Sequence, residues 1–377
     1  MTPTTTSTLP IDETVAPENA EAVSAQIREC ADTGTAVYPV GGGTSLDYGM
    51  TATQPGIGLS LEAMNRVVDY PARDMTITVE SGITMAALAE TLAGEGQRVP
   101  LDVPQPESAT LGGVIATNTS GALRYAHGTV RDYVIGIRAV DGRGVPFRGG
   151  GRVVKNVAGY DFCKLLTGSL GTLGVITEVT LKVKPLAPRS AALVADVADW
   201  QRADALLVAL TTSNIPAATL ELLAGPAWTD LPGTPAPSAD TVARIVVGLE
   251  GTEGEIGWLR GEVIRRLGEL NVPAQVVDEA SVADLAALLA GFAAVVTPTV
   301  ADSPLVIKAN VVSSATVEMV RTVVGFDAAC SLQAHAGSGT VIARFAELPD
   351  VGIAPMMVRH LQPLAHTLRQ RDRTGVP

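Results

Sequence analysis

The length, composition and charge of the chain indicate a well-buried, acidic protein. Its 377 residues exceed one typical hydrophobic core, and 46% of them are hydrophobic against 18% charged, which predicts two domains and excludes a disordered chain. The net charge of −12 argues against general nucleic-acid binding, which needs basic side chains to neutralise phosphates, although backbone N–H groups can still bind an anion.

Helices and strands alternate in the first third of the chain. The apolar spacing and the turn residues predict a helix at residues 17–31, a strand at 36–40 and a second strand at 76–79. A second helix at 84–94 and an extended proline-rich segment at 100–106 follow. The loop Gly41-Gly42-Gly43-Thr44-Ser45 directly follows the first strand.

Antiparallel strands are predicted next. Strands over residues 133–140 and 145–147 flank Asp141-Gly142, a dipeptide typical of a tight hairpin turn. Residues 174–183 predict another strand, and the prolines that follow close the unit. We therefore expect two domains, at residues 1–188 and 189–377.

The C-terminal half has a different pattern. Apolar strands at residues 243–249 and 305–312 alternate with helices at 253–270 and 281–294. Strand–helix–strand units of this kind predict an open α+β domain. The proline-rich and alanine-rich residues 225–239 are predicted to form a surface loop.

Cysteine and histidine content limits the kinds of site. Cys30, Cys163 and Cys330 are far apart and form no CxxC motif, so we expect neither a disulfide framework nor a four-cysteine iron–sulfur site. Four scattered histidines without an HExxH motif predict no metal site. Residues 285–296 form the longest apolar run, too short for a membrane span, and the N-terminus lacks a signal-peptide pattern. We expect a cytoplasmic protein.

The phosphate-binding motifs of the commonest nucleotide folds are absent. No GxxxxGK[ST] sequence occurs, which excludes a P-loop protein. A GxxGxxG run spans Gly168 to Gly174, but the alternating residues 175–180 that follow predict a strand, whereas the glycines of a Rossmann turn open a helix.

Clustered glycines nevertheless predict a site for a large, flat, phosphate-bearing ligand. The N–H groups of residues 41–45 can form a concave nest for a pyrophosphate, and the alternative is a plain tight turn. Gly112-Gly113 would let backbone approach an aromatic ring system, with Thr117, Asn118 and Ser120 as hydrogen-bonding residues. The alternative for this segment is a glycine-containing helix packed on a sheet.

Charged residues near the glycines are further candidates. Arg124 is placed to hold a cofactor's anionic end or a substrate carboxylate, and His127 lies beside Gly128. Arg131 and Asp132 fit a simple salt bridge better. Residues 155–161, with Lys155, Asn156, Tyr160 and Asp161, either gate a site or hold a loop together, and the structural role is favoured.

Several of these motifs together resemble a known family. The matching segments are residues 38–46 (YPVGGGTSL), 110–117 (TLGGVIAT), 128–136 (GTVRDYVIG), 154–161 (VKNVAGYD) and 168–178 (GSLGTLGVITE). Over residues 35–185 the chain resembles the FAD-binding domain of the vanillyl-alcohol oxidase and p-cresol methylhydroxylase (PCMH) superfamily. Within it, the chain is similar to the smaller FAD-binding subunits of bacterial glycolate oxidase.

The resemblance implies an α+β protein, in which a PCMH-type FAD-binding domain of two α/β subdomains precedes a ferredoxin-like α+β domain. It implies that the pyrophosphate lies against Gly41, Gly42, Gly43, Thr44, Ser45 and Leu46, and that the flavin lies against Gly112, Gly113, Thr117, Ser120, Gly121, Gly174, Val175 and Ile176, with Arg124 and His127 as further cofactor contacts. Because the first loop contains neither histidine nor cysteine, we expect FAD to be bound non-covalently.

The implied function is that of an FAD-binding subunit in a glycolate oxidase complex. Catalytic relatives carry an HxHxGDGN-type segment, whereas this chain has only His335-Ala-Gly-Ser-Gly339. A paralogous flavin subunit would then oxidise glycolate, and an iron–sulfur subunit would pass electrons to quinones and attach the complex to the inner membrane.

Two alternatives remain open. One is an autonomous oxidase of a small 2-hydroxy acid such as D-lactate, with His335 or Tyr160 as base and Arg124 holding the carboxylate. The other is a structural partner without flavin.

Overall fold

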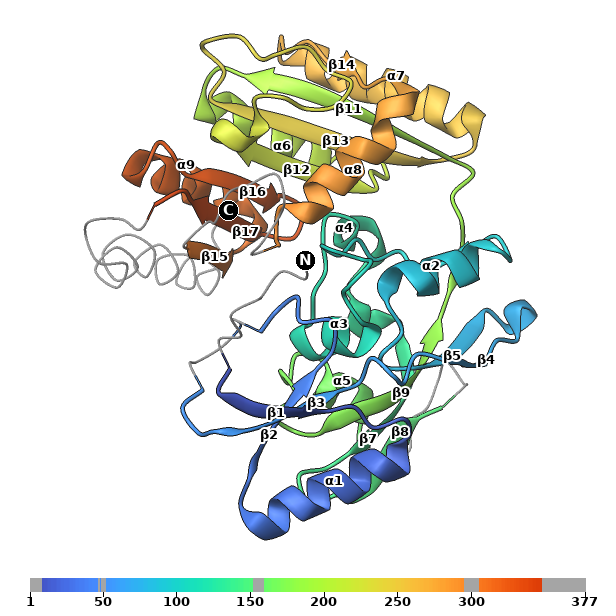
Figure 1. The fold of residues 1–377 in the computed structure, drawn as a ribbon. Helices are drawn as coiled ribbons and strands as arrows, with labels where there is room; N and C mark the ends of the chain where they lie inside the picture. The colour runs from blue at the N-terminus through green and yellow to red at the C-terminus, as the bar shows by residue number, and fades with distance from the viewer. Residues whose placement is uncertain (1–8, 47, 49–51, 152–158, 295–304, 348–377) are drawn as a thin grey trace. The chain divides into compact units, whose positions relative to one another are not determined.

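The computed structural model describes residues 9–46, 48, 52–151, 159–294 and 305–347, which divide into two compact units (Figure 1). The first unit contains described residues up to 120 and residues 128–186, and the second contains residues 121–127 and the described residues from 187 onward. The sequence suggested a single boundary near residue 188. The structure differs in that the short segment 121–127 belongs to the second unit.

Two main sheets form the first unit. A parallel sheet has the strand order β1-β3-β2, and an antiparallel sheet has the order β4-β5-β9-β7-β8. Their strands are β1 (Ile11–Val15), β2 (Ala36–Val40), β3 (Gly56–Ser60), β4 (Val67–Asp69), β5 (Thr76–Glu80), β7 (Val134–Val140), β8 (Pro146–Gly150) and β9 (Val175–Lys182). A two-stranded ladder joins β6 (Gln97–Arg98) to β10 (Lys184–Pro185).

The helices of the first unit are α1 (Ala20–Thr33), α2 (Met85–Ala93), α3 (Leu111–Thr117) and α5 (Phe162–Leu166). Helix α1 confirms the predicted first helix. Its N-terminus is capped by Asn19, whose side chain accepts a hydrogen bond from the N–H of Ala22 at 2.9 Å. The helix ends at Gly34, which has the left-handed φ of 72°.

The hairpin of β7 and β8 is confirmed, but its turn differs from the predicted type. The Asp141 carboxylate accepts hydrogen bonds from the N–H groups of Arg143 and Val145, both at 2.9 Å, and these bonds lower its pKa. Positive φ falls on Gly144 (73°) rather than on Gly142. The loop of residues 141–145 is therefore organised by the aspartate side chain and not by a two-residue Asp-Gly turn.

One face of the five-stranded sheet carries the main core of the first unit. Ile77, Val79 and Leu181 of the sheet are fully buried against Leu88 of α2 and Ile115 of α3. Burial of such side chains contributes about 1.5–3 kcal/mol each. This core holds α3 against the five-stranded sheet.

The second unit is built on a seven-stranded antiparallel sheet of order β14-β11-β13-β12-β16-β17-β15. Its strands are β11 (Arg189–Val197), β12 (Thr219–Ala224), β13 (Ala243–Gly251), β14 (Gln275–Val276), β15 (Leu305–Asn310), β16 (Ser331–His335) and β17 (Thr340–Phe345), and its helices are α4 (Arg124–His127), α6 (Trp200–Thr211), α7 (Glu253–Glu269), α8 (Val282–Gly291) and α9 (Thr316–Phe326).

The connectivity of the second unit confirms the expected ferredoxin-like pattern. The elements β11-α6-β12-β13-α7-β14 form a βαββαβ unit whose strands lie in the order β14-β11-β13-β12. The strands β16, β17 and β15 extend the same sheet. Helices α6, α7 and α9 supply buried side chains to the core on one face, and α8 packs on the other.

The predicted surface loop at residues 225–239 is only partly exposed. Trp228 is 2% exposed, its indole N–H donates to the carbonyl of Leu332 at 2.7 Å, and its ring lies 4.6 Å from that of Phe292. The composition of the segment indicated a loop correctly, but this one aromatic residue anchors it in the core. Within the described residues, no helix has the length and apolarity needed to cross a membrane.

Candidate functional site

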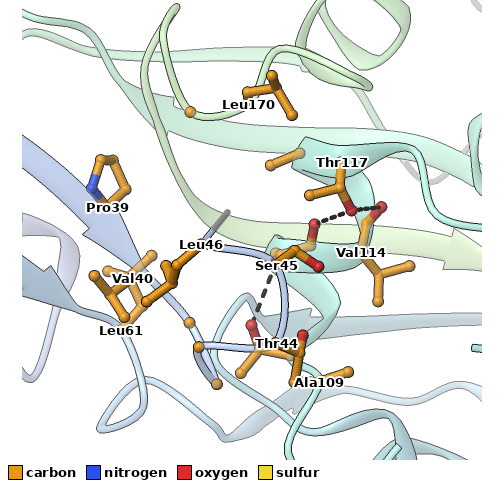
Figure 2. Close-up of a pocket in the computed structure, with 18 of the residues that line it drawn as sticks. Pro39, Val40, Thr44, Ser45, Leu46, Leu61, Ala109, Val114, Thr117 and Leu170 are labelled. Carbon is orange, nitrogen blue, oxygen red and sulfur yellow. Dashed lines mark hydrogen bonds between the residues drawn. The ribbon is translucent and has the colours of Figure 1, made fainter. Parts of the chain in front are cut away.

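Three glycine-rich segments of the first unit enclose a cavity of about 190 Å³ (Figure 2). Its walls are the end of β2 with the following loop 41–46, helix α3, and the loop 168–174 with the start of β9. In Figure 2, Pro39 and Val40 lie across the cavity from Val114 and Thr117, and Leu170 approaches from the third segment. The structure thus brings together segments that lie far apart in the sequence.

The first loop packs closely against the chain that leads into α3. A Cβ atom on Gly41 would lie 2.1 Å from the hydroxyl of Thr110, and one on Gly42 would lie 1.6 Å from the carbonyl oxygen of Ser108. Gly43 has a φ of 71°. A side chain on Gly41 or Gly42 would therefore collide with the neighbouring segment, and Gly43 adopts a backbone conformation that strains other residue types.

Backbone N–H groups of this loop are available to a ligand. In the described part of the chain, the N–H groups of Gly42, Gly43 and Thr44 donate to no protein acceptor. Successive N–H groups around a residue of left-handed φ form the kind of concavity that binds phosphate oxygens. The hydrogen bonding of the loop therefore fits an anionic ligand.

Helix α3 forms the second wall. Thr110 caps its N-terminus by accepting from the N–H of Gly113 at 3.3 Å. The N–H of Gly112 donates to the carbonyl of Ser81 at 2.7 Å, and a Cβ on Gly112 would lie 2.9 Å from that of Ser81. Gly112 therefore allows the helix to pack on the sheet, as the structural alternative predicted, while both glycines also line the cavity.

The third wall is the predicted GxxGxxG segment, which leads into strand β9 as expected. Positive φ occurs at Gly168, Leu170, Gly171 and Gly174. The N–H groups of Gly168 and Leu170 donate to the carbonyls of Ile115 and Ala116, at 2.9 and 2.8 Å. These bonds tie the loop to the last turn of α3.

Most, but not all, of the predicted cofactor residues line this cavity. Those that do are Gly41, Gly42, Gly43, Thr44, Ser45, Leu46, Gly112, Gly113, Thr117, Gly174, Val175 and Ile176. Those that do not are Ser120, Gly121, Arg124 and His127. Ser120 is 7% exposed, and its hydroxyl has no hydrogen-bond partner in the described residues, whereas the other three belong to the second unit.

Arg124 and His127 make contacts within the second unit. An Arg124 Nη atom donates to the hydroxyl of Thr340 at 3.1 Å, and Nε2 of His127 lies 3.0 Å from the Glu250 carboxylate. Desolvation lowers the pKa of Lys308, and the charge of nearby Arg124 lowers that pKa further. Two cationic side chains thus share one region of this unit.

His335 is a buried sheet residue at the end of β16. Its Nδ1 atom lies 2.9 Å from each carboxylate oxygen of Glu221, which also accepts from the side chain of Gln333 at 2.9 Å. Glu221 and His335 are 0% and 2% exposed. Sequence reasoning missed Glu221, although a single acidic residue within the apolar run of residues 220–224 was a usable signal.

The remaining candidates lie elsewhere. Tyr160 is 85% exposed, and Asp161 caps α5 by accepting from the N–H of Lys164 at 3.0 Å, which supports the structural role. Asp132 bonds Thr129 at 2.8 Å in a capping box, in place of the expected pair with Arg131. Lys155 and Asn156 lie outside the described residues.

Metal ligands do not gather in the described part of the chain. No group of three or more His, Cys, Asp or Glu side chains there is placed to hold a metal ion.

Comparison with known proteins identifies the first unit. Residues 11–149 match the FAD binding domain family, which covers the first two walls of the cavity. The match supports FAD as the cofactor.

Curated relatives include proteins of hydroxy-acid oxidation. The chain is 32% identical over 215 residues to "Glycolate oxidase subunit GlcD" of Bacillus subtilis, covering 57% of this chain and 46% of that protein. It is 36% identical over 212 residues to "D-lactate dehydrogenase [cytochrome], mitochondrial" of Arabidopsis thaliana (56% and 37%), and 37% identical over 153 residues to "Glycolate oxidase subunit GlcE" of Escherichia coli (38% and 44%). The matched part spans less than half the length of each relative.

Solved structures share the fold over nearly the whole chain. An alkyldihydroxyacetonephosphate synthase structure has a TM-score of 0.70 and 18% identity, covering 95% of this chain and 75% of that one. A structure of p-cresol methylhydroxylase has a TM-score of 0.66 and 16% identity, covering 96% and 80%. The architecture is thus of the PCMH type.

Proposed function

We propose that this chain, with its FAD-binding domain of the PCMH type, is the FAD-binding subunit of a complex that oxidises glycolate to glyoxylate. The observation that carries the proposal is the glycine-walled cavity, whose loop has N–H groups that donate to no acceptor among the described residues. The same loop lies within the residues that match an FAD binding domain. Two relatives with the printed name of glycolate oxidase subunits supply the substrate class.

Residues of the three walls would hold the cofactor. The loop 41–46 would bind the pyrophosphate through backbone N–H groups, while α3 and the first residues of β9 would lie against the flavin. The described residues that line the cavity include neither histidine nor cysteine, which supports non-covalent binding. Bound FAD supplies the hydride acceptor that oxidation of a hydroxy acid requires.

The surroundings of His335 support a division of labour between subunits. Oxidation of a hydroxy acid also needs a base for the hydroxyl proton. His335 is buried and bonded to Glu221 in this chain, and no acidic residue or asparagine follows it in residues 336–339. We infer that a second flavin subunit provides the base, and that an iron–sulfur subunit carries the electrons onward.

A second candidate function is favoured by the polar residues of the second unit. If the chain is an autonomous oxidase of a small 2-hydroxy acid, Arg124 and Lys308 would attract the carboxylate. His335, with Nδ1 held by Glu221, would present Nε2 as the basic nitrogen. The identity with a D-lactate dehydrogenase supports this alternative.

Anaerobic reduction separates the two functions. The full chain would be purified with FAD, and its visible spectrum recorded after addition of glycolate or D-lactate. Bound flavin that stays oxidised alone, and is bleached by glycolate once the partner chains are added, supports the subunit. Bleaching of the isolated chain, lost in His335→Asn, would instead support the autonomous enzyme, and absence of flavin would contradict both.

A further inference from the structure

A second cavity lies in the first unit, on the face of the five-stranded sheet opposite its main core. It has a volume of about 430 Å³, and residues of β4, β5, β9, β7 and β8 line it. The core face carries apolar side chains such as Ile77 and Val179. Because side chains alternate between faces along a strand, the residues between these apolar ones form the surface of this cavity.

A row of charged residues crosses that face. Arg148 of β8 is directly opposite Arg138 of β7, which is opposite Glu178 of β9, and Glu178 is opposite Glu80 of β5. Arg138 and Glu178 form an ion pair at 3.0 Å, and Glu80 bonds Arg66 at 2.7 Å. Among the described residues, Arg148 makes no ion pair or hydrogen bond through its side chain.

Placing two arginines opposite each other is unfavourable without a counter-ion. Like charges that face each other across strands are destabilising, and within the part of the chain that the structure describes only one of the two, Arg138, has a carboxylate partner. The pair therefore leaves one guanidinium charge uncompensated at the cavity in a chain whose net charge is −12. An anion between the two guanidinium groups would remove this repulsion.

The neighbouring row forms the floor of the cavity. Gly150, Gly136, Thr180 and Thr78 follow one another across the same four strands and line the cavity beside the arginines. The hydroxyls of Thr78 and Thr180 lie 2.9 Å apart. One of them donates to the other, so the accepting hydroxyl still has its own proton to donate.

We propose that this cavity is a binding site for a small oxyanion, bearing a carboxylate or a phosphate group. The guanidinium groups of Arg148 and Arg138 form its charged wall, because they are suited to hold two oxygens of such a group. A threonine hydroxyl adds a donor from the floor of the cavity. The site is separate from the glycine-walled cavity, and the two share no lining residue.

Titration with inorganic phosphate tests the proposal. The full chain, saturated with FAD so that the cofactor site is occupied, would be titrated by calorimetry at constant ionic strength. We expect saturable binding that becomes at least tenfold weaker in Arg148→Gln. The matched control is Arg143→Gln, which removes an exposed arginine from the turn of the same hairpin and should leave binding unchanged. Equal affinity in Arg148→Gln, or no binding to the wild type, would overturn the site.

Thermal unfolding without phosphate tests whether weaker phosphate binding in Arg148→Gln results from destabilisation of the protein. Because Arg148→Gln removes one of two facing like charges, the variant should melt at the same temperature as the wild type or higher. Phosphate should then raise the melting temperature of the wild type and of Arg143→Gln, but not that of Arg148→Gln. This comparison is independent of the proposed function, since it needs neither glycolate nor partner chains. A phosphate-dependent rise of the same size in Arg148→Gln would contradict the site.

Discussion

At the scale of single residues, the glycines of the glycine-walled cavity have different roles. Gly41 faces the Thr110 side chain, and Gly42 faces the Ser108 carbonyl, so closely that any side chain on either glycine would collide with the protein itself. Gly113 differs, because a Cβ there would meet only the Thr110 hydroxyl, at 3.2 Å. The missing side chain of Gly113 therefore gives room chiefly to the cavity, which makes this residue the sharpest probe of cofactor binding.

We predict that Gly113→Ala weakens FAD binding without unfolding the protein. The added methyl group should cost about 1–3 kcal/mol of binding free energy by overpacking, while alanine favours a helix over glycine by about 0.5–1 kcal/mol. Flavin fluorescence titration measures the affinity, and thermal unfolding of the FAD-free protein measures the stability. Gly142→Ala, at an exposed turn with free space around it, is the matched control. Equal FAD affinities in both variants would contradict the placement of Gly113 against the cofactor.

Glu80 gives a prediction for acid stability. Desolvation would raise its pKa, but hydrogen bonds from the side chain and N–H of Arg66 outweigh this effect and lower the pKa below its ordinary value of 4.5. A carboxylate with a lowered folded-state pKa stabilises the protein above the unfolded pKa, and the contribution is lost as the pH falls through the folded pKa. Wild-type stability should therefore fall more steeply than that of Glu80→Gln between about pH 5 and pH 3.

Denaturant unfolding at several pH values measures this difference. Glu62→Gln, which removes an exposed carboxylate from a nearby position, should keep the wild-type slope. Parallel pH profiles for wild type and Glu80→Gln would contradict the role of the Arg66–Glu80 pair.

At the scale of elements, local patterns in the sequence predicted more than the contacts between distant segments. The apolar spacing and the caps located α1, α2 and α7 to within a few residues because these signals are local. The pairing of Glu221 with His335 was not predicted, because it depends on the register of β12 against β16, two strands 114 residues apart at these positions. The buried position of Trp228 was hidden for the same reason.

Segment 121–127 shows most clearly what the sequence left open. Gly121, the adjoining Gly128 and the proximity to α3 suggested a flavin-lining role for Arg124 and His127, yet both bond to strands of the second unit. The alternation of apolar residues, which indicates strands and helices, carries no information on which unit a short connecting segment joins. The lining of the cavity was predicted more closely than the surroundings of segment 121–127, because the segments 38–46, 110–117 and 168–178 that carry the family resemblance fall on its three walls.

A single methyl group should disturb this segment. A Cβ on Gly337 would lie 2.0 Å from the ring of Tyr125, so Gly337→Ala should force the ring aside and destabilise the protein by about 1–3 kcal/mol. Chemical denaturation measures the loss. Gly325→Ala, in α9 with free space around it, should be neutral or stabilising, and equal behaviour of the two variants would contradict the packing.

At the scale of the whole molecule, the two units share the chain in an interleaved order. The described chain passes from the first unit into the second at residue 121, returns at residue 128 and leaves again after residue 186. Thr117 and Thr119, just before the first crossing, line the glycine-walled cavity. The integrity of that wall should therefore depend on contacts that residues 124–127 make within the second unit.

Truncation tests this dependence. A chain ending at Pro188 lacks Thr340, Glu250 and Gly337, which contact Arg124, His127 and Tyr125. We expect the truncated protein to bind FAD at least tenfold more weakly than the full chain, an effect of about 1.4 kcal/mol. Fluorescence titration of both proteins provides the comparison, and wild-type affinity in the truncated chain would show that the first unit is self-sufficient.

The visible spectrum of the purified full chain, recorded before and after denaturation and filtration, tests the cofactor site most directly. We predict a yellow protein with bound flavin absorbance, whose FAD passes entirely into the filtrate once the protein is unfolded, and a Gly113→Ala variant purified with less flavin. A colourless protein that takes up no added FAD, or flavin that stays attached to the unfolded chain, would contradict non-covalent FAD binding in the glycine-walled cavity.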